Sequence, residues 1–287
     1  MEISIVEEKA FLLPEIITPE QARERAWDKK VAAFASGITS IFSRPKSEEI
    51  EVTYSEKRYE PFWFIQCQGH YIYDRSVRFP VKAGGPEVKS VTVDGQDFCL
   101  VDDKKFGPNT FFLPGIEHCH EDHRKEVYCD GMTGERQDLS ALLRCPRQEI
   151  ALDSFTPDGI VVAPDIRASF VVRQLLQEMI KPVQADKIIE EQVVLERLEL
   201  YYRPLYAFEY KWIPKERVAV AEFDGLSGQM RTGGKTLRQS LGGKLSRDLL
   251  FDLGADVLGM VVPGGSIAVK LTKAAIDGTR KNKSSPV

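Results

Sequence analysis

Apolar residues recur at helical spacing in an early segment of the chain. Thr18, Pro19 and Gln21 predict a capped helix start. A threonine at the N-cap, a proline at the first helical position and a glutamine three residues after the cap suit the free amides of a first turn. We expect this helix to end near Gly37. The apolar positions of its buried face are Ala22, Ala26 and Val31.

A second segment, after Pro164-Asp165, separates polar and apolar residues into two stripes. Such a period of 3.6 residues predicts an amphipathic helix, and Lys181-Pro182 predicts its end. The polar stripe comprises Arg173, Gln174, Gln177 and Glu178. The apolar stripe comprises Val171, Val172, Leu175, Leu176, Met179 and Ile180.

Other segments have the composition of β-strands. Residues 50–54 alternate between apolar and polar side chains, as a strand does. Residues 193–202, 205–212 and 218–223 form a run with the composition of β-strands. Residues 246–258 place leucine and valine on one helical face, which predicts a third helix.

Two pairs of short motifs indicate an internal repeat. Tyr59-Glu60-Pro61 resembles Tyr202-Arg203-Pro204, and Asp130-Gly131-Met132-Thr133-Gly134 resembles Asp224-Gly225-Leu226-Ser227-Gly228. Asp-Gly between strands predicts a tight turn, and Tyr-x-Pro suits the start of an edge strand. The motifs are 71 residues apart in the first copy and 22 in the second, so the first copy carries an insertion of 49 residues.

These elements predict an α+β protein with two related helix-plus-antiparallel-sheet units and a helical C-terminal extension. We expect the first unit, with its insertion, at residues 1–150 and the second at residues 151–232. Residues 233–287 form the extension, which contains glycine-rich stretches and ends in a basic tail.

Each unit resembles the PepSY domain family. The resemblance is carried by residues 17–22 and 130–134 in the first unit and by residues 219–228 in the second, and the stretches that it covers make up about half of the chain. PepSY domains pair an N-terminal helix with a small antiparallel sheet that ends in a hairpin like Asp-x-x-Thr-Gly. The resemblance implies an interaction or inhibitory module rather than a catalyst. Members are commonly extracytoplasmic, and this chain departs from them in its N-terminus and in its Tyr-x-Pro strands.

Composition narrows the class of protein and its location. A hydrophobic content of 43% and a charged content of 29% are ordinary for a globular protein, and a net charge of −4 argues against a general nucleic-acid binder. The N-terminus lacks the basic start and apolar run of a signal peptide, and no run of eighteen apolar residues predicts a transmembrane helix. Five cysteines without regular spacing favour a reducing compartment. We therefore predict a cytoplasmic protein.

Histidine and cysteine gather in one short stretch of the chain. Three of the four histidines lie within residues 118–123, and the fourth belongs to Cys67-Gln68-Gly69-His70. These residue types are the ligands that zinc prefers. We predict a structural zinc site that joins the insertion to the first sheet. Its ligands are Cys67, His70, Cys119 and His123, with His118, His120 and Cys129 as alternates.

Two other functions remain open. His118, His120 and His123 are candidate ligands of a catalytic metal, with Glu121 or Asp122 as the general base of a metal-dependent hydrolase. Alternatively, the basic residues between Arg231 and Lys244 are candidates for contacts with nucleic acid.

We favour a non-enzymatic interaction or adaptor protein stabilised by zinc. The apolar segment of residues 249–275 contains few groups suited to acid–base chemistry, and its glycines permit close approach of another backbone. This segment is our candidate surface for a protein partner or for a homo-oligomer. The alternative is that it completes the core.

Overall fold

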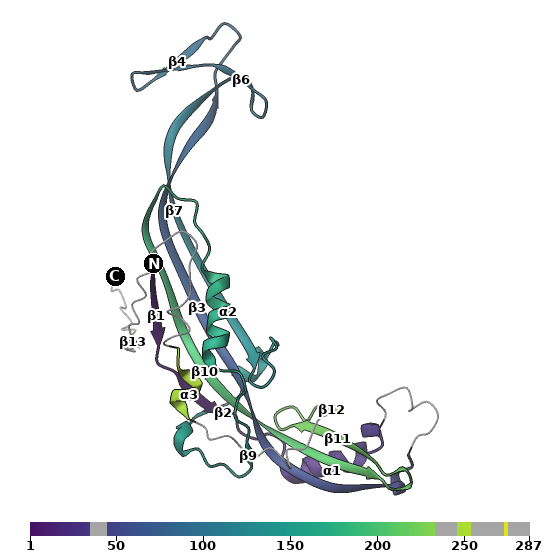
Figure 1. The fold of residues 1–287 in the computed structure, drawn as a ribbon. Helices are drawn as coiled ribbons and strands as arrows, with labels where there is room; N and C mark the ends of the chain where they lie inside the picture. Colours follow the sequence, from purple (N-terminus) through teal and green to yellow (C-terminus); the bar gives the residue numbers. More distant parts are fainter. Residues whose placement is uncertain (35–44, 233–245, 254–272, 275–287) are drawn as a thin grey trace, which may run out of the picture.

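Three long antiparallel strands form the frame of the molecule. The computed structural model describes residues 1–34, 45–232, 246–253 and 273–274. Strand β3 (Ile50–Lys82) lies between β10 (Lys187–Trp212) and β7 (Gly107–Asp130). The strands are long and twist along their length, and the molecule is elongated and curved (Figure 1).

Shorter strands border this frame. Strands β1 (Glu2–Val6) and β2 (Lys9–Leu12) run parallel to β10 at residues 192–195 and 199–202, and β11 (Arg217–Asp224) pairs antiparallel with residues 205–212. The same sheet includes β6 (Val101–Asp103), β8 (Gln148–Glu149), β9 (Ile160–Val161), β12 (Met230–Thr232) and β13 (Lys273–Ala274). A separate hairpin comprises β4 (Ser90–Val93) and β5 (Gln96–Cys99).

The predicted helices are present in the described part of the chain, but the first ends at Lys29 rather than near Gly37. Helix α1 (Pro19–Lys29) begins with both hydrogen bonds of the capping box between Thr18 and Gln21, and α2 (Ala168–Met179) buries its whole apolar stripe as far as Met179. The C-terminal helix α3 (Arg247–Phe251) is shorter than predicted. Single 3₁₀ turns lie at Ala32–Phe34, Ser47–Glu49, Ser140–Arg144, Leu152–Ser154 and Ile213–Lys215.

The predicted α+β class is wrong, because the described chain is a mainly β fold. Strands β3 and β10 pair over nearly their whole lengths, so neither belongs to one unit alone. Helix α1 packs against β10 and β11, whereas α2 packs against β3 and β7. Each helix therefore lies on strands that come from the other part of the sequence, and two long shared strands replace two separate helix-plus-sheet units.

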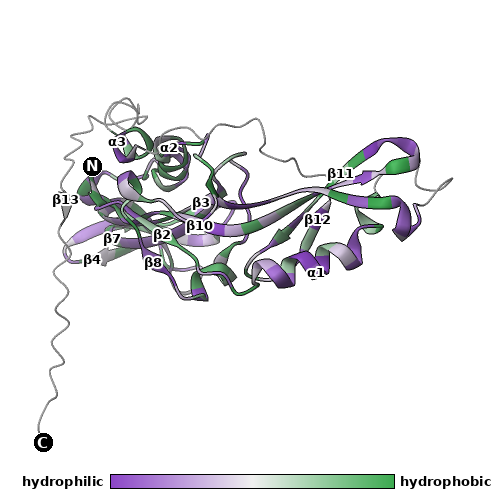
Figure 2. Ribbon diagram, turned by 90° about the horizontal axis from the view of Figure 1, so that it is seen from below, coloured by the Kyte–Doolittle hydropathy of each residue, from purple (hydrophilic) through white to green (hydrophobic). Residues whose placement is uncertain are grey.

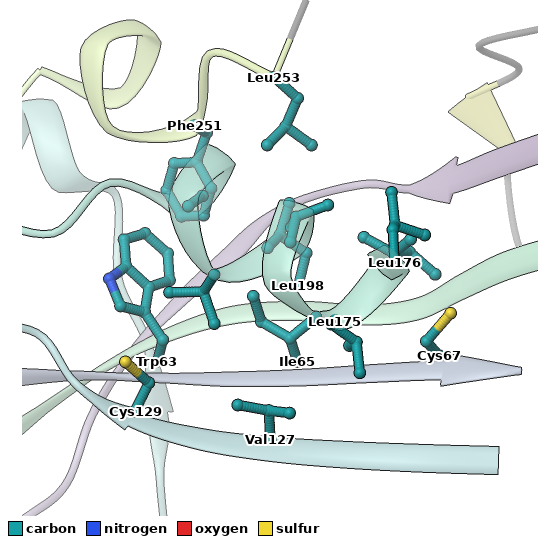
Figure 3. Close-up of a cluster of buried hydrophobic side chains, with 14 of the residues drawn as sticks. Trp63, Ile65, Cys67, Val127, Cys129, Leu175, Leu176, Leu198, Phe251 and Leu253 are labelled. Carbon is teal, nitrogen blue, oxygen red and sulfur yellow. The ribbon is translucent and has the colours of Figure 1, made fainter. Parts of the chain in front are cut away.

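The main core lies between α2 and the sheet (Figure 3). Leu175 and Leu176 of α2 are fully buried there with Trp63, Ile65 and Cys67 of β3. Truncating a leucine in such a core costs about 2–5 kcal/mol. Helix α1 buries only Ala22 and Ala26, and Figure 2 shows it as mainly hydrophilic.

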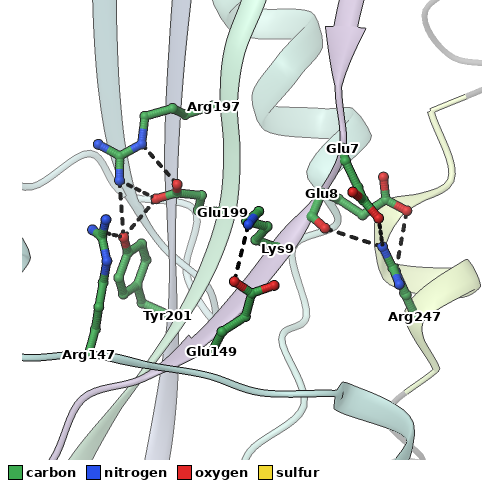
Figure 4. Close-up of polar contacts among 9 residues, drawn as sticks. All are labelled: Glu7, Glu8, Lys9, Arg147, Glu149, Arg197, Glu199, Tyr201 and Arg247. Carbon is green, nitrogen blue, oxygen red and sulfur yellow. Dashed lines mark hydrogen bonds and ion pairs between the residues drawn. The ribbon is translucent and has the colours of Figure 1, made fainter. Parts of the chain in front are cut away.

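The opposite face of the sheet carries charged groups beside aromatic rings. The Tyr201 hydroxyl donates to Glu199, and the guanidinium groups of Arg147 and Arg197 donate to the Tyr201 oxygen (Figure 4). The Tyr201 ring itself stacks on Phe62 with centroids 5.1 Å apart. This face therefore buries polar as well as apolar side chains, and its charged groups form hydrogen bonds.

The Tyr-x-Pro motifs lie inside strands and not at strand starts. Pro204 lies between two neighbours of β10. The pairing of β10 with β2 ends at Tyr202, and its pairing with β11 starts at Leu205. Pro61 lies just before Phe62, where β7 begins to pair with β3. A proline has no amide hydrogen to donate to a ladder, so it is tolerated where the neighbouring strand changes.

The β3–β7 hairpin continues beyond the body of the molecule as an arm, which we define as residues 75–117. Strand β10 starts at Lys187 opposite Asp74, so it does not accompany the arm. Arg75 lies opposite Glu117, and the two strands pair from there to Lys82 and Thr110. The arm projects from one end of the molecule and carries the β4–β5 hairpin at its tip (Figure 1). It accounts for most of the additional length between Tyr59 and Asp130.

The start of the C-terminal extension belongs to the core. Leu250, Phe251 and Leu253 are buried, and the Phe251 ring meets Trp63 edge-on at 5.2 Å. Leu249 is half exposed. The rest of the proposed partner segment lies outside the described residues, except for Lys273–Ala274, which pair with β1. None of the described helices is both long and apolar enough to cross a membrane.

Candidate functional site

The histidine-rich stretch is part of strand β7, so its side chains alternate between the two faces of the sheet. Cys119, Glu121 and His123 point to the face that carries α2. His118, His120 and Asp122 point to the opposite face. Strand β3 alternates in the same way, because His70 lies directly opposite Asp122 and Cys67 lies opposite Lys125. The predicted ligands are thereby divided between two faces.

The two core cysteines are poorly suited to zinc. Cys67 and Cys129 are 0% and 1% exposed in the hydrophobic core (Figure 3). Burial raises the pKa of the Cys67 thiol to about 12 and that of Cys129 to about 11. A metal binds the thiolate, which an apolar environment disfavours. Both cysteines therefore act as small apolar side chains here.

Cys119 and His123, the other two predicted ligands on the α2 face, lie at different positions along the β3–β7 ladder and do not gather around Cys67. Cys119 is opposite Tyr73 and donates a long hydrogen bond of 3.8 Å to the Glu117 carbonyl. His123 Nε2 lies 3.0 Å from a Glu121 carboxylate oxygen. His70 is on the other face, so the set of Cys67, His70, Cys119 and His123 does not surround a common position.

The structure instead brings His70, His120 and Asp122 together. One ligand atom from each of these residues lies within 4.8 Å of the others. His70 Nδ1 is 2.7 Å from Asp122 Oδ1, and His120 Nε2 is 3.4 Å from His70 Nδ1 and 3.2 Å from Asp122 Oδ2. The Asp122 carboxylate raises the pKa of His70, and the hydrogen bond from His70 lowers the pKa of Asp122.

Further acidic side chains border this cluster. Glu190 of β10 has an oxygen 3.9 Å from His70 Nε2. One rung further along the ribbon, His118 Nδ1 lies 2.7 Å from Asp74 Oδ1. Each of the histidines on this face thus has a carboxylate neighbour, and all of these groups remain accessible to solvent.

The three histidines proposed for a hydrolase do not meet. His118 and His120 share one face, whereas His123 lies on the other with Glu121. The Glu121 carboxylate accepts hydrogen bonds from Tyr73 and from the His123 ring, and these contacts lower its pKa. Its hydrogen bond and charge raise the pKa of Tyr73 to about 12. Glu121 is therefore an ionised acceptor rather than a base beside the other two histidines.

Sequence reasoning missed Asp122 as a ligand and did not consider Glu190. The signal for Asp122 was present in the order His118-x-His120-x-Asp122, because alternate residues of a strand share one face. Glu190 is far from the cluster in sequence and is placed only by the pairing of β10 with β3.

The basic stretch proposed for nucleic acid lies almost wholly outside the described residues. Arg231 belongs to β12, and residues 233–245 are not described. No protein-family model matches the chain, and no curated protein or solved structure shows significant similarity to it.

Proposed function

We propose that this protein is a non-enzymatic interaction protein and that the arm is its partner-binding element. The observation that carries this proposal is the exposure of large apolar side chains on a projecting two-stranded ribbon. Phe79 is 42% exposed and Ile116 is 59% exposed. Single exposed apolar residues are common, but these two lie on strands that bury little of their own surface.

The arm is shaped to present side chains. A Cβ atom built on Gly115 would lie 2.6 Å from the Phe79 ring, so the ring lies directly over the glycine. This contact supports the ring while leaving its outer side in solvent. At the far end of the arm, the ring centroids of Phe98 in β5 and Phe111 in β7 are 5.7 Å apart. This contact packs the tip hairpin against the ribbon.

Two prolines favour recognition through the faces of the arm, one of which carries Phe79 and the other Ile116, rather than through its edges. Pro80 and Pro114 lie on opposite strands of the ribbon. A proline in a two-stranded ladder turns its nitrogen outward, because an inward position would remove a ladder hydrogen bond. Each outer edge therefore lacks a donor that an added strand would need, which protects it from edge-to-edge pairing.

The charge of the arm favours a protein partner. Six basic and six acidic side chains lie between Arg75 and Glu117, so the arm carries no net charge. A surface that binds the phosphate backbone requires an excess of lysine and arginine. A neutral ribbon with exposed phenylalanine and isoleucine is better matched to a mixed polar and apolar protein surface.

Site-specific crosslinking tests the proposal. A photoreactive phenylalanine analogue in place of Phe79 should capture a defined protein in cells, which is identified by mass spectrometry and then purified. The same analogue in place of Val52, which is 37% exposed on the body, is the matched control and should not capture it.

A shortened protein completes the test. Replacing residues 76–116 by Asn-Gly joins Arg75 to Glu117 through a tight turn and leaves the β10 pairing intact. The purified partner should bind the full chain and bind this variant at least tenfold more weakly. Equal binding to both, with unchanged circular dichroism of the body, would exclude the arm as the binding element.

A further inference from the structure

Three potential metal ligands converge on the open face of the ribbon near the base of the arm. His70 and Asp122 form a directly opposed pair on β3 and β7, and His120 reaches the pair from the next position of β7 on that face. The His70 and His120 rings meet edge-on, with centroids 4.8 Å apart and an angle of 80° between their planes. Their ring nitrogens and the carboxylate thus face a common position.

The distances from His120 Nε2 to the other two residues fit a small divalent cation. Tetrahedral ligands about 2.0–2.1 Å from zinc are about 3.3 Å from one another. His120 Nε2 lies 3.4 Å from His70 Nδ1 and 3.2 Å from Asp122 Oδ2. The shorter contact of 2.7 Å, between His70 Nδ1 and Asp122 Oδ1, is a hydrogen bond that a cation would replace.

We propose that His70, His120 and Asp122 bind one divalent zinc-class cation, with water in the remaining position. Two imidazoles and one carboxylate suit zinc, nickel or copper. Calcium and magnesium prefer an all-oxygen set. The proposal is independent of the arm's role, since it concerns residues outside the arm and a different kind of ligand.

Glu190 is placed to orient the first histidine. When His70 binds the cation through Nδ1, its Nε2 carries the proton, and that atom lies 3.9 Å from the Glu190 carboxylate. Carboxylates commonly hold metal-bound histidines by accepting a hydrogen bond from this second nitrogen, which Glu190 would do after a small approach. Asp122 and Glu190 together also balance the charge of a divalent cation. Glu190 is thus a positioning residue supplied by the third strand.

The position in the fold gives the site a mechanical consequence. His70 lies five residues before Arg75, where the ribbon leaves β10 and becomes the arm. A cation held by β3 and β7 would fasten the two strands together at this point. The side chains of His120 and Asp122 are 58% and 55% exposed, so the cation would exchange with solvent rather than be permanently enclosed.

Titration of the full chain with zinc and cobalt tests the proposal. Isothermal calorimetry should show one zinc ion per chain. The cobalt complex should lack the thiolate charge-transfer band, because no cysteine is among the ligands. His120→Ala and Asp122→Asn should each weaken zinc binding at least tenfold, and Glu190→Gln should weaken it less.

His123→Ala is the matched control, since His123 is exposed on the same strand but faces the other way. Its zinc affinity should stay within twofold of the parent protein. Equal affinities for the His120→Ala and His123→Ala variants would overturn the proposal. A cobalt spectrum with thiolate bands that survive both substitutions would also overturn it and would assign the metal to cysteine. Circular dichroism of each variant verifies the fold.

Discussion

Pro61 and Gly131 are joined by a hydrogen bond of 3.0 Å from the glycine amide to the proline carbonyl. Gly225 makes the equivalent bond of 2.9 Å to Pro204. In both turns the preceding aspartate accepts two amide hydrogen bonds from the residues that follow the glycine. The two Tyr-x-Pro motifs and the two Asp-Gly motifs are therefore parts of two matching junctions, each made by a strand and the turn beside it.

This packing predicts that Gly131→Ala and Gly225→Ala destabilise the fold. A Cβ atom would lie 2.7 Å from the Pro61 carbonyl oxygen in the first and 2.9 Å from the Pro204 carbonyl oxygen in the second. Such overpacking costs about 1–3 kcal/mol. Urea denaturation measures the loss. Gly84→Ala is the control, because a Cβ there meets nothing within 4 Å. A loss in the control as large as in the two variants would contradict the role of the junctions.

Local patterns in the sequence were sufficient for the start of α1 and for the buried face of α2, although not for the ends of α1 and α3. Thr18 and Gln21 define the start of α1 through contacts within one turn, and the apolar stripe of α2 follows from helical geometry. The fold class depends on pairing between distant residues. Tyr59 lies opposite Pro204, 145 residues later in the chain, and no local pattern shows that β3 and β10 are partners. The prolines suggested strand starts, although they mark changes of neighbouring strand.

In the candidate site, too, local features were visible in the sequence, whereas features that depend on distant residues were not. The concentration of histidine near residue 120 was visible in the sequence, and so was the alternation that separates His120 from His123. In strand β7 this alternation places His120 and His123 on opposite faces, so closeness in the sequence does not make them one ligand cluster. The burial of Cys67 depends on α2, which is about a hundred residues away in the chain. Its exclusion from the site could not be inferred from the Cys-x-x-His spacing.

Acid should weaken the contact between α2 and β7. The Arg136 and Lys125 side chains lower the pKa of Glu178 on α2 to about 2, from an ordinary value of 4.5. A carboxylate with a depressed pKa stabilises the fold above its unfolded value, and this contribution is lost as the pH falls from about 4.5 towards 2. Glu178 is 35% exposed, so solvent screening limits the effect at neutral pH to about 0.5–1 kcal/mol.

Thermal melts of the parent and of Glu178→Gln between pH 7 and pH 2 measure this effect. The parent should melt at the higher temperature at pH 7, and the difference should shrink below about pH 4.5. A difference that is independent of pH would contradict the assignment. Glu135→Gln, at an exposed position before Arg136, is the control and should track the parent.

Phe251 should be needed for stability, because it packs against Trp63 from the C-terminal extension. Phe251→Ala removes an 8% exposed ring and should cost about 3 kcal/mol, measured by urea denaturation. Leu249→Ala in the same helix is the control; this side chain is 51% exposed, and its loss should cost less than about 0.5 kcal/mol. Similar losses for both would contradict a core role confined to the buried side of α3.

Thiol labelling should separate the five cysteines by their environment. Cys67 and Cys129 are buried, and their pKa values are raised to about 12 and about 11, so both access and thiolate content are low. Brief treatment of the native protein with iodoacetamide at pH 7.5, followed by peptide mass spectrometry, should label Cys99, which is exposed, and leave these two unmodified. All five should react in urea, which controls for peptide recovery. Rapid native labelling of Cys67 would place it outside the core and would restore it as a candidate metal ligand.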